Sequence, residues 1–534
     1  SWIGLAISPI NLSPSLVRKV IALRSAGRTV LGRINSAMPV SLSLSMKTFE
    51  SLNPATGDVI GVFPQTSAKE VDEAVAKANV ASEHWASLSF RKRGIILRDW
   101  ASLLTREIES SADLIHRETG KPLSDARLEV SIAIEHIGWA AKYAPKVLSD
   151  QSRPSGLLMF NMAAKVQRSP FGVIGIIGPW NYPFFTPIGS IAYALAAGNT
   201  VVFKPSEFTP AVGSWLGESW KRIAPFADIF MVVTGGGDTG AALTKSKVGK
   251  ISFTGSTKTG KLVAAACALN MTPVLLECGG KDAVLIDRDA DLKKAAEVTL
   301  WHAMANAGQS CIAAERVYVH RDVAEKFSNL IVEQATKIKA GYEDGANYGP
   351  ATMPSQLKVI KSHIDDAEKR GGRFLFGDKS AVKGNFVSPV ILADVPEDSK
   401  AISDETFGPT LIINTVRNMD EAVDLANASK YGLGAAVWSK KNGKRIASLL
   451  KCGMVSINSA FSNTAVSSLP FGGIKDSGYG RTHGAEGLLE FTYPRAIIKL
   501  RFRIPINFTT FDRSQRADRI IMLLTKILHK RRRR

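Results

Sequence analysis

Cysteine is scarce in this sequence, which has four in 534 residues, at Cys267, Cys278, Cys311 and Cys452. Cysteines this few and this scattered do not form the disulfide framework of a small secreted domain, so they indicate a reducing compartment and favour the cytoplasm. No group of cysteine and histidine residues has the spacing of metal ligands. We therefore expect no metal site.

Long apolar runs are also missing. No run reaches the ~18 residues that a membrane-spanning helix needs, which argues against an integral membrane protein. The sequence has 45% hydrophobic and 22% charged residues, a composition typical of a globular protein. Its length is sufficient for two or three domains with their own cores.

Acidic residues are absent from positions 1–45, which hold five basic residues. Residues 501–534 hold eleven basic and two acidic residues, so the two ends account for +14 of the formal charge of +20. The remaining charge is unremarkable for a body of this size. The basicity therefore belongs to the ends, and we expect no nucleic-acid partner.

Residues 1–45 are rich in serine, arginine and leucine, a composition that resembles an organellar transit peptide, but they lack the compact apolar core of a secretory signal. Met46 stands two residues before Thr48, where the sequence begins to look folded. We predict a leader over residues 1–45 that is disordered or non-native. A functional transit peptide, and with it an organellar location, is the alternative.

Strand-like and helix-like segments alternate through the body of the chain. Residues 172–177 form an apolar, β-branched run that suits a strand buried on both faces, and residues 199–203 form another. Helix-like segments separate such runs, and the same alternation resumes after Glu277. This pattern predicts an α/β fold with parallel, doubly wound sheets in two domains.

A carboxylate and a thiol flank one of the predicted helices, at residues 291–305. Glu277 follows an apolar strand and opens Glu277-Cys-Gly-Gly-Lys281, while Cys311 ends Asn306-Ala-Gly-Gln-Ser-Cys311. A cysteine with access to substrate and a carboxylate that can activate water would supply a nucleophile and a general base. From these residues alone, a packing cysteine and a surface carboxylate are equally acceptable.

Asn181 stands beyond the end of the strand at 172–177, where open α/β sheets place ligands. Its amide can donate two hydrogen bonds, so together with the Cys311 backbone N–H it could stabilise an oxyanion. An Asx-turn cap is the structural alternative.

The segments ECGGKDAVLI and AGQSC closely resemble the active-site signatures of the aldehyde dehydrogenase superfamily, with Cys278 in place of a usual leucine. Glu405-Thr-Phe-Gly-Pro409 and the run from Pro470 to Gly480 also match the family, and the resemblance extends from about Thr48 to Leu500. It implies a non-acylating, NAD(P)-dependent enzyme in which Cys311 is the nucleophile, Glu277 the base and Asn181 an oxyanion donor.

The resemblance also implies a cofactor site. Lys204 and Glu207 would bind the adenosine ribose, Glu405 the nicotinamide ribose, and Phe407 would pack against the nicotinamide ring. A carboxylate at position 207 would repel the extra phosphate of NADP, so NAD is expected, with NADP as the alternative. The full set of expected cofactor-binding residues is Ile177, Pro179, Trp180, Lys204, Ser206, Glu207, Gly255, Ser256, Glu405 and Phe407.

A domain plan follows from the same resemblance. We expect an NAD-binding domain at 46–152 and 171–277, a catalytic domain at 278–484, and a small β arm at 153–170 and 485–502. In the family such an arm joins subunits, which implies a homodimer or homotetramer. A solvent-exposed loop is the alternative reading of the hairpin-like segment 153–169.

Residues 503–534 form a basic tail with an amphipathic helical pattern, in which Ala517, Ile520, Leu524 and Leu528 share one face. Such a helix can lie on an anionic membrane or dock on a partner. It can also cover apolar surface of its own subunit.

Three other activities remain open at this point. A CoA-acylating dehydrogenase is disfavoured because members of that branch usually lack a glutamate at the position of Glu277. A cysteine hydrolase would need a histidine partner, and His302 is the nearest one in sequence. A succinate-semialdehyde dehydrogenase is suggested by RTHGAEGLL from Arg481 and by the basic tail.

The substrate is the least determined feature of the sequence. The segments expected to line the substrate channel contain no arginine, which favours an apolar or aromatic aldehyde over an acid semialdehyde. The residues in question are Phe184, Phe185, Thr186, Ser459, Phe461 and Ser462.

Overall fold

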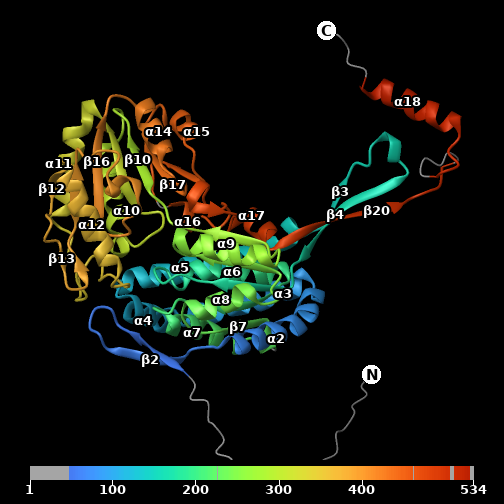
Figure 1. Ribbon diagram of the computed structural model, residues 1–534, viewed down its shortest axis with the longest axis horizontal. Helices are drawn as coiled ribbons and strands as arrows, with labels where there is room; N and C mark the ends of the chain where they lie inside the picture. Colours follow the sequence, from blue (N-terminus) through green and yellow to red (C-terminus); the bar gives the residue numbers. More distant parts are fainter. Residues whose placement is uncertain (1–46, 225, 461, 505–509, 530–534) are drawn as a thin grey trace, which may run out of the picture. The chain divides into compact units, whose positions relative to one another are not determined.

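The computed structural model describes residues 47–224, 226–460, 462–504 and 510–529 (Figure 1). The predicted leader, residues 1–45, lies outside the described residues. The described chain begins with a hairpin, β1 (Thr48–Leu52) and β2 (Val59–Pro64). Among the described residues, no helix is both long and apolar enough to span a membrane.

The first large sheet has six strands in the order β19-β9-β8-β5-β6-β7, and all but β19 are parallel. Every residue of β5 and β6 is buried, which explains why these strands are continuously apolar in sequence. The strands are β5 (Val173–Ile177), β6 (Thr200–Lys204), β7 (Phe230–Val232), β8 (Lys250–Thr254), β9 (Val274–Glu277) and β19 (Gly478–Tyr479).

In the part of the chain that the structure describes, eight helices belong to this first domain, which Figure 1 draws mostly in blue to green. Ser67 caps the first of them through a capping box with Glu70, as its sequence predicts. Trp85, Trp100 and Trp220 are fully buried in the core of this domain. The helices are α2 (Ala68–Ser87), α3 (Phe90–Arg106), α4 (Ile108–Thr119), α5 (Leu123–Leu148), α6 (Phe185–Ala197), α7 (Pro210–Lys221), α8 (Gly237–Lys245) and α9 (Thr257–Leu269).

The second large sheet has seven strands in the order β12-β15-β16-β11-β10-β17-β18, parallel except for β12. Together the two sheets confirm the predicted α/β fold. The strands are β10 (Asp282–Ile286), β11 (Ala314–His320), β12 (Arg373–Phe376), β15 (Val390–Ala393), β16 (Thr410–Val416), β17 (Gly434–Trp438) and β18 (Met454–Ile457), and β13 (Val382–Lys383) with β14 (Phe386–Val387) forms a separate hairpin.

The longest described helices, α5 with 26 residues and α2 with 20, both belong to the first domain. Helix α11 ends at Ala335, and Ala340 further along the chain forms a β-bridge with Tyr348. The helices are α10 (Leu292–Met304), α11 (Ala324–Ala335), α12 (Gln356–Lys369), α13 (Lys400–Ser403), α14 (Met419–Ala428), α15 (Gly443–Leu449), α16 (Ser462–Ala465) and α17 (Gly484–Glu490).

A third sheet forms the arm. Its antiparallel strands β3 (Gln151–Arg153), β4 (Met162–Pro170) and β20 (Thr492–Leu500) lie in the order β20-β4-β3. The arm is smaller than the predicted 485–502, because residues 484–490 form α17 instead. Leu488 and Phe491 are buried in the core of the first domain, so their apolar side chains hold this segment away from the arm.

The predicted plan placed a single boundary between the two domains at residue 278, and the structure differs from it. Strand β19, within the predicted catalytic segment 278–484, pairs with β9 of the first sheet, with Gly478 opposite Glu277. The chain then continues through α17 into the arm. After the arm, α18 (Gln515–His529) forms the amphipathic helix predicted for the tail.

A pair of leucine substitutions tests the position of the first core. Leu216 in α7 is 0% exposed, whereas Leu269 at the end of α9 is 83% exposed. We expect Leu216→Ala to lower the free energy of unfolding by ~2–5 kcal/mol, because it leaves a cavity. The same change at Leu269 should cost less than ~0.5 kcal/mol. Urea denaturation followed by tryptophan fluorescence would measure both, and equal effects would contradict this core assignment.

Candidate active site

One cavity of about 600 Å³ lies where the order of strand addition in the first sheet reverses. The chain runs outward from β5 to β7 and then returns to place β8 beside β5, which creates a switch point at their carboxyl ends. The residues that follow these two strands line the cavity. So do all the site residues predicted from sequence, namely Ile177, Pro179, Trp180, Asn181, Lys204, Ser206, Glu207, Gly255, Ser256, Glu277, Cys311, Glu405 and Phe407.

A left-handed turn brings Cys311 to the cavity after α10. Asn306 and Ala307 have φ values of 53° and 56°, and Gly308 follows with 69°. Position 308 must be glycine, because a Cβ there would lie 2.1 Å from the carbonyl oxygen of Gly408. Two consecutive non-glycine residues in this conformation are strained, a feature that clusters at active sites.

The side chain of Gln309 fixes this turn from inside. Its amide nitrogen donates to the carbonyl oxygens of Asn306 and Pro350, at 2.9 and 3.2 Å, and its amide oxygen accepts from the Thr352 N–H at 2.9 Å. These three hydrogen bonds of the Gln309 side chain therefore all go to backbone atoms. The consequence is a half-buried Cys311 whose position is set by neighbours rather than by a helix.

The surroundings of Cys311 oppose ionisation of its thiol. Burial, followed by the negative charges of Glu277, Glu405 and Asp282, raises the pKa of Cys311 well above its usual range. The thiol is thus protonated at neutral pH in this arrangement. A nearby base or a positive charge is required to form the nucleophilic thiolate.

Glu277 is the last residue of β9 and is buried. One carboxylate oxygen accepts from the Thr482 hydroxyl at 2.6 Å and the other from the Thr254 hydroxyl at 3.3 Å. Burial raises the pKa of Glu277 to about 7, against the lowering effect of the two threonines. A carboxyl with this pKa can exchange a proton near neutral pH, as a general base must.

Hydrogen bonds hold both the side-chain amide and the backbone carbonyl of Asn181. Its side-chain nitrogen donates to the Gln309 carbonyl at 2.9 Å, and its own carbonyl accepts from Lys121 Nζ at 2.8 Å and from the Asn306 amide at 3.1 Å. Because the amide of Asn181 has two N–H groups, one remains for a ligand oxygen. Its partner Lys121 was not among the site residues predicted from the sequence.

The other end of the cavity is lined by the residues after β5, β6 and β8. Buried Lys204 pairs with exposed Glu207 at 3.2 Å, beside the end of β6. Ser256 caps α9 by accepting from the Thr259 N–H at 3.2 Å, so the positive end of that helix dipole faces the cavity. Trp180 and Phe407 meet edge to face, with ring centroids 5.5 Å apart.

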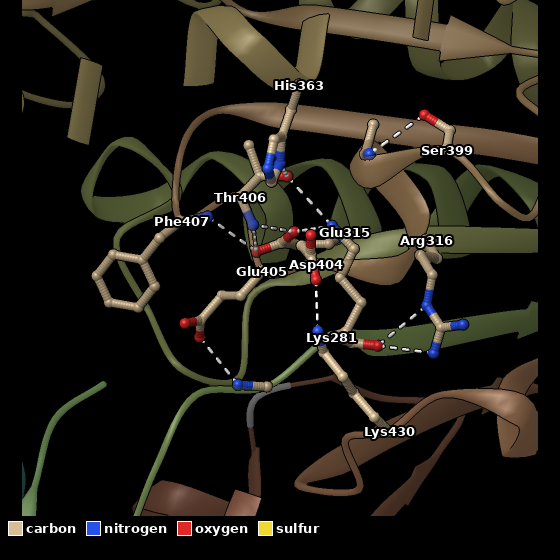
Figure 2. Close-up of polar contacts among 12 residues, drawn as sticks. Lys281, Glu315, Arg316, His363, Ser399, Asp404, Glu405, Thr406, Phe407 and Lys430 are labelled. Atoms are coloured by element: carbon tan, nitrogen blue, oxygen red, sulfur yellow. Dashed lines mark hydrogen bonds and ion pairs between the residues drawn. The ribbon is translucent and has the colours of Figure 1, made fainter. Parts of the chain in front are cut away.

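Glu405 lies on a loop that a buried ion pair holds in place (Figure 2). The Glu315 carboxylate, from β11, pairs with Lys281 and accepts from the Thr406 and Phe407 backbone N–H groups at 2.8 and 3.0 Å. Glu405 itself accepts from the Gly280 N–H at 2.9 Å. Burial and the charge of Glu315 raise the pKa of Glu405 to about 8.

Glu315 was missed in the sequence, although a signal existed. It stands with Arg316 inside strand β11, where every residue is buried. Charged residues are almost never fully buried unless paired, so their presence in such a strand indicates buried partners. Arg316 fits the same rule, since its guanidinium donates to the Lys281 carbonyl at 2.8 Å.

Several candidates do not reach the cavity. His302, the proposed partner of a cysteine hydrolase, is buried elsewhere, and burial lowers its pKa to about 4. Phe184 packs in the core of the first domain, whereas Phe185 and Thr186 line the cavity. Among the late-loop candidates, Ser459 does not line it and Phe461 lies outside the described residues.

Comparison with known proteins places this geometry in a family. A model of the aldehyde dehydrogenase family matches residues 42–497. The chain is 34% identical to the 4,4'-diapolycopene aldehyde oxidase of a Methylomonas species, over 86% of this chain and 87% of that protein. It is 36% identical to the NADP+-dependent succinate-semialdehyde dehydrogenase of Escherichia coli, over 83% of this chain and 92% of that enzyme.

A solved structure supports the same placement. The NAD-dependent aldehyde dehydrogenase of Sinorhizobium meliloti superposes with a TM-score of 0.83 at 31% identity, covering 87% of this chain and 93% of that one. The family match at residues 42–497 spans both large sheets and most of the arm rather than a single motif. This chain therefore belongs to the aldehyde dehydrogenase family.

Proposed function

We propose that this enzyme oxidises an aldehyde to the carboxylic acid with NAD+ or NADP+, through a thioester on Cys311. The observation that carries the proposal is the single cavity onto which Cys311, Glu277 and Asn181 open together with the expected dinucleotide-binding residues. One end of the cavity holds a nucleophile, a base and an oxyanion donor. The other end holds the expected dinucleotide-binding residues, which are called the nucleotide cradle below. This arrangement suits the reaction.

The cavity residues fit a dinucleotide. Lys204 and Glu207 offer a donor and an acceptor to ribose hydroxyls, and the amino end of α9 offers a positive potential to the pyrophosphate. Gly255, which also lines the cavity, packs against the Phe253 ring so closely that a Cβ would come within 2.7 Å of it, so no larger residue fits there. When bound, the nicotinamide accepts the hydride that leaves the substrate carbon.

The protein residues supply the remaining chemistry. The Cys311 sulfur, once deprotonated, attacks the aldehyde carbon and forms a thiohemiacetal whose oxyanion would accept from Asn181 and from the Cys311 N–H. Loss of hydride leaves a thioester on Cys311. Glu277 then takes a proton from water as that water attacks the thioester, which releases the acid and restores the thiol.

Two of the competing activities have less support. A hydrolase that pairs a cysteine with His302 lacks contact between that histidine and the cavity. A CoA-acylating enzyme would have no use for Glu277, whose buried position and pKa of about 7 suit the activation of water. Succinate-semialdehyde dehydrogenase activity is supported only by similarity to relatives and by the RTHGAEGLL segment.

Substitution of the two catalytic candidates separates the steps. Cys311→Ala should lower kcat at least ~1,000-fold because no thiohemiacetal can form. Glu277→Gln should leave acylation in place and slow thioester hydrolysis by ~100-fold, so that NADH appears as a pre-steady-state burst. Stopped-flow absorbance with an aldehyde panel, with and without CoA, measures both effects.

Cys452→Ala is the matched control, since Cys452 is half-buried but does not line the cavity, and it should keep full activity. Unchanged steady-state turnover of the Glu277 variant would remove Glu277 from the mechanism. NADH formation that depends on CoA would instead favour the acylating reaction.

The preference between NAD+ and NADP+ depends on Glu207 in this proposal. Glu207→Gln removes the charge that would repel a 2′-phosphate, and we expect kcat/KM for NADP+ to rise roughly tenfold relative to NAD+. Glu218→Gln, an exposed change on α7 outside the cavity, is the control. A ratio that does not move would show that another residue sets the preference.

Subunit association is the expected role of the arm. Strand β20 pairs with β4 along one edge only, and its other edge has no partner strand among the described residues. Ile498 and Leu500 are exposed on it, and a long exposed edge strand favours pairing with another chain. We infer a homodimer or homotetramer that is built through this arm.

The tail supports a peripheral contact with an anionic membrane. On α18, Met522, Leu523, Ile527 and Leu528 are exposed, so the described part of the chain does not cover them. Arg516, Arg519 and Lys526 lie on the same helix, and the sequence continues with five more basic residues at 530–534. Exposed apolar side chains beside a cationic surface suit an acidic lipid headgroup layer.

Vesicle co-sedimentation tests this contact. The full chain should bind phosphatidylserine vesicles but not phosphatidylcholine vesicles, and added salt should weaken the binding. A chain truncated after residue 502 should lose binding and keep its oligomeric mass in light scattering. Failure of the full chain to bind the anionic vesicles would indicate that another protein surface covers α18.

A further inference from the structure

We propose that the substrate is an aldehyde whose far end is uncharged and apolar, and not a semialdehyde that carries a carboxylate. This inference rests on the proposed function and concerns the same cavity. It follows from the charges and side chains of the wall that lies beyond Cys311, on the side away from the nucleotide cradle.

Apolar side chains from several elements form this wall. Helix α5 presents Leu128 and Ile132, four residues apart and therefore on one face. The start of α6, α10, and the loops before α12 and α17 supply the other large apolar groups. The set is Leu128, Ile132, Phe185, Trp301, Met353 and Phe471.

No arginine is found among the described residues that line the cavity, and three lysines are. Lys204 pairs with Glu207 in the nucleotide cradle, and Lys245 lies at the end of α8, the helix whose Gly237 and Gly240 also face that cradle. Neither is part of the wall beyond Cys311. Lys121 is the remaining lysine among the described residues that line the cavity.

Other groups of the protein already neutralise and bind the ammonium group of Lys121. Its ammonium group is fully buried, pairs with Glu129 at 2.6 Å and donates to the Asn181 carbonyl at 2.8 Å. The same group lies 4.1 Å from the centroid of the Tyr182 ring, a favourable cation–π position. A substrate carboxylate could gain this lysine only by displacing Glu129 from its partner.

Histidine does not provide a cation either. His483 lies in the wall, with its ring centroid 5.5 Å from those of Phe185 and Phe471, and 4.0 Å from that of His136. Burial lowers the pKa of both imidazoles, that of His136 to about 4 and that of His483 well below its usual value. His483 is therefore a neutral ring within an aromatic cluster.

Negative charge is present where a semialdehyde would need positive charge. Asp125, one turn before Leu128 on α5, lines the cavity, and burial raises its pKa because the carboxylate is poorly solvated there. A substrate carboxylate in this wall would lose its hydration, find no free cation and face Asp125. An apolar group would instead exchange water contact for contact with the wall.

Three aldehydes of similar shape test the inference. Succinate semialdehyde ends in a carboxylate, 4-methylpentanal replaces that carboxylate with an isopropyl group, and 4-trimethylammoniobutanal ends in a cation. We expect kcat/KM for 4-methylpentanal to exceed that for succinate semialdehyde at least ~100-fold, because the charged group is desolvated without a partner. NADH formation by the full-length enzyme is the readout.

A charge introduced into the wall provides a second test. Ile132→Arg places a guanidinium on the cavity face of α5 and should raise kcat/KM for succinate semialdehyde by roughly tenfold or more. The uncharged control Ile132→Gln should not. Circular dichroism would establish that both variants fold. If they do not fold, the comparison of the three aldehydes with the wild-type enzyme still tests the inference.

The outcomes separate this inference from the function on which it rests. Turnover that is highest with succinate semialdehyde or with the cationic aldehyde would overturn the apolar assignment and leave the dehydrogenase reaction intact. No NADH with any of the three, nor with longer aliphatic or aromatic aldehydes, would reject the proposed function itself.

Discussion

The peptide unit of Asn181 is the contact on which the rest of the site depends, because it joins the two large domains at the turn that carries Cys311. Its carbonyl accepts from Lys121 in the first domain and from Asn306 in the second, while its side chain donates to the Gln309 carbonyl. These bonds hold Asn306 in a left-handed conformation that costs ~1–3 kcal/mol for a non-glycine residue. The same hydrogen bonds that offset this strain therefore orient the amide expected to bind the substrate oxygen.

Electrostatics ties that geometry to the reaction. Glu277, Glu405 and Asp282 are buried near one thiol, and burial raises the pKa of each of these carboxyls, to about 7, 8 and 7 respectively. Their charges in turn raise the pKa of Cys311. A positive charge would favour the thiolate in a site with this excess of acidic groups, and a bound oxidised nicotinamide ring would carry one.

The sequence predicted the parts of this site that lie in short, contiguous motifs. Strands such as β5 and β6 are apolar throughout because both faces are buried, and the residues after them follow directly at the sheet edge. It did not predict Thr482 as the partner of Glu277 or Glu315 as the support of the 405–407 loop, since these contacts join residues 205 and 91 positions apart. No local pattern encodes such pairs. The predicted residue range of the arm differs from the structure for a related reason, because burial of Leu488 and Phe491 against the first domain is a tertiary effect.

Helix α5 shows how one element serves both catalysis and substrate choice. Glu129 faces inward, neutralises Lys121, and accepts from the backbone N–H groups of Phe184 and Phe185 at 2.9 and 3.1 Å. Removing that carboxylate would leave a buried ammonium group unpaired beside Asn181, at a large cost in stability. Leu128 and Ile132 occupy the neighbouring positions toward the cavity and make no polar contact that supports the catalytic residues. Changes at these two positions can therefore alter which aldehyde is accepted while the oxyanion donor stays in place, and the wall of α5 is where specificity is free to vary within this fold.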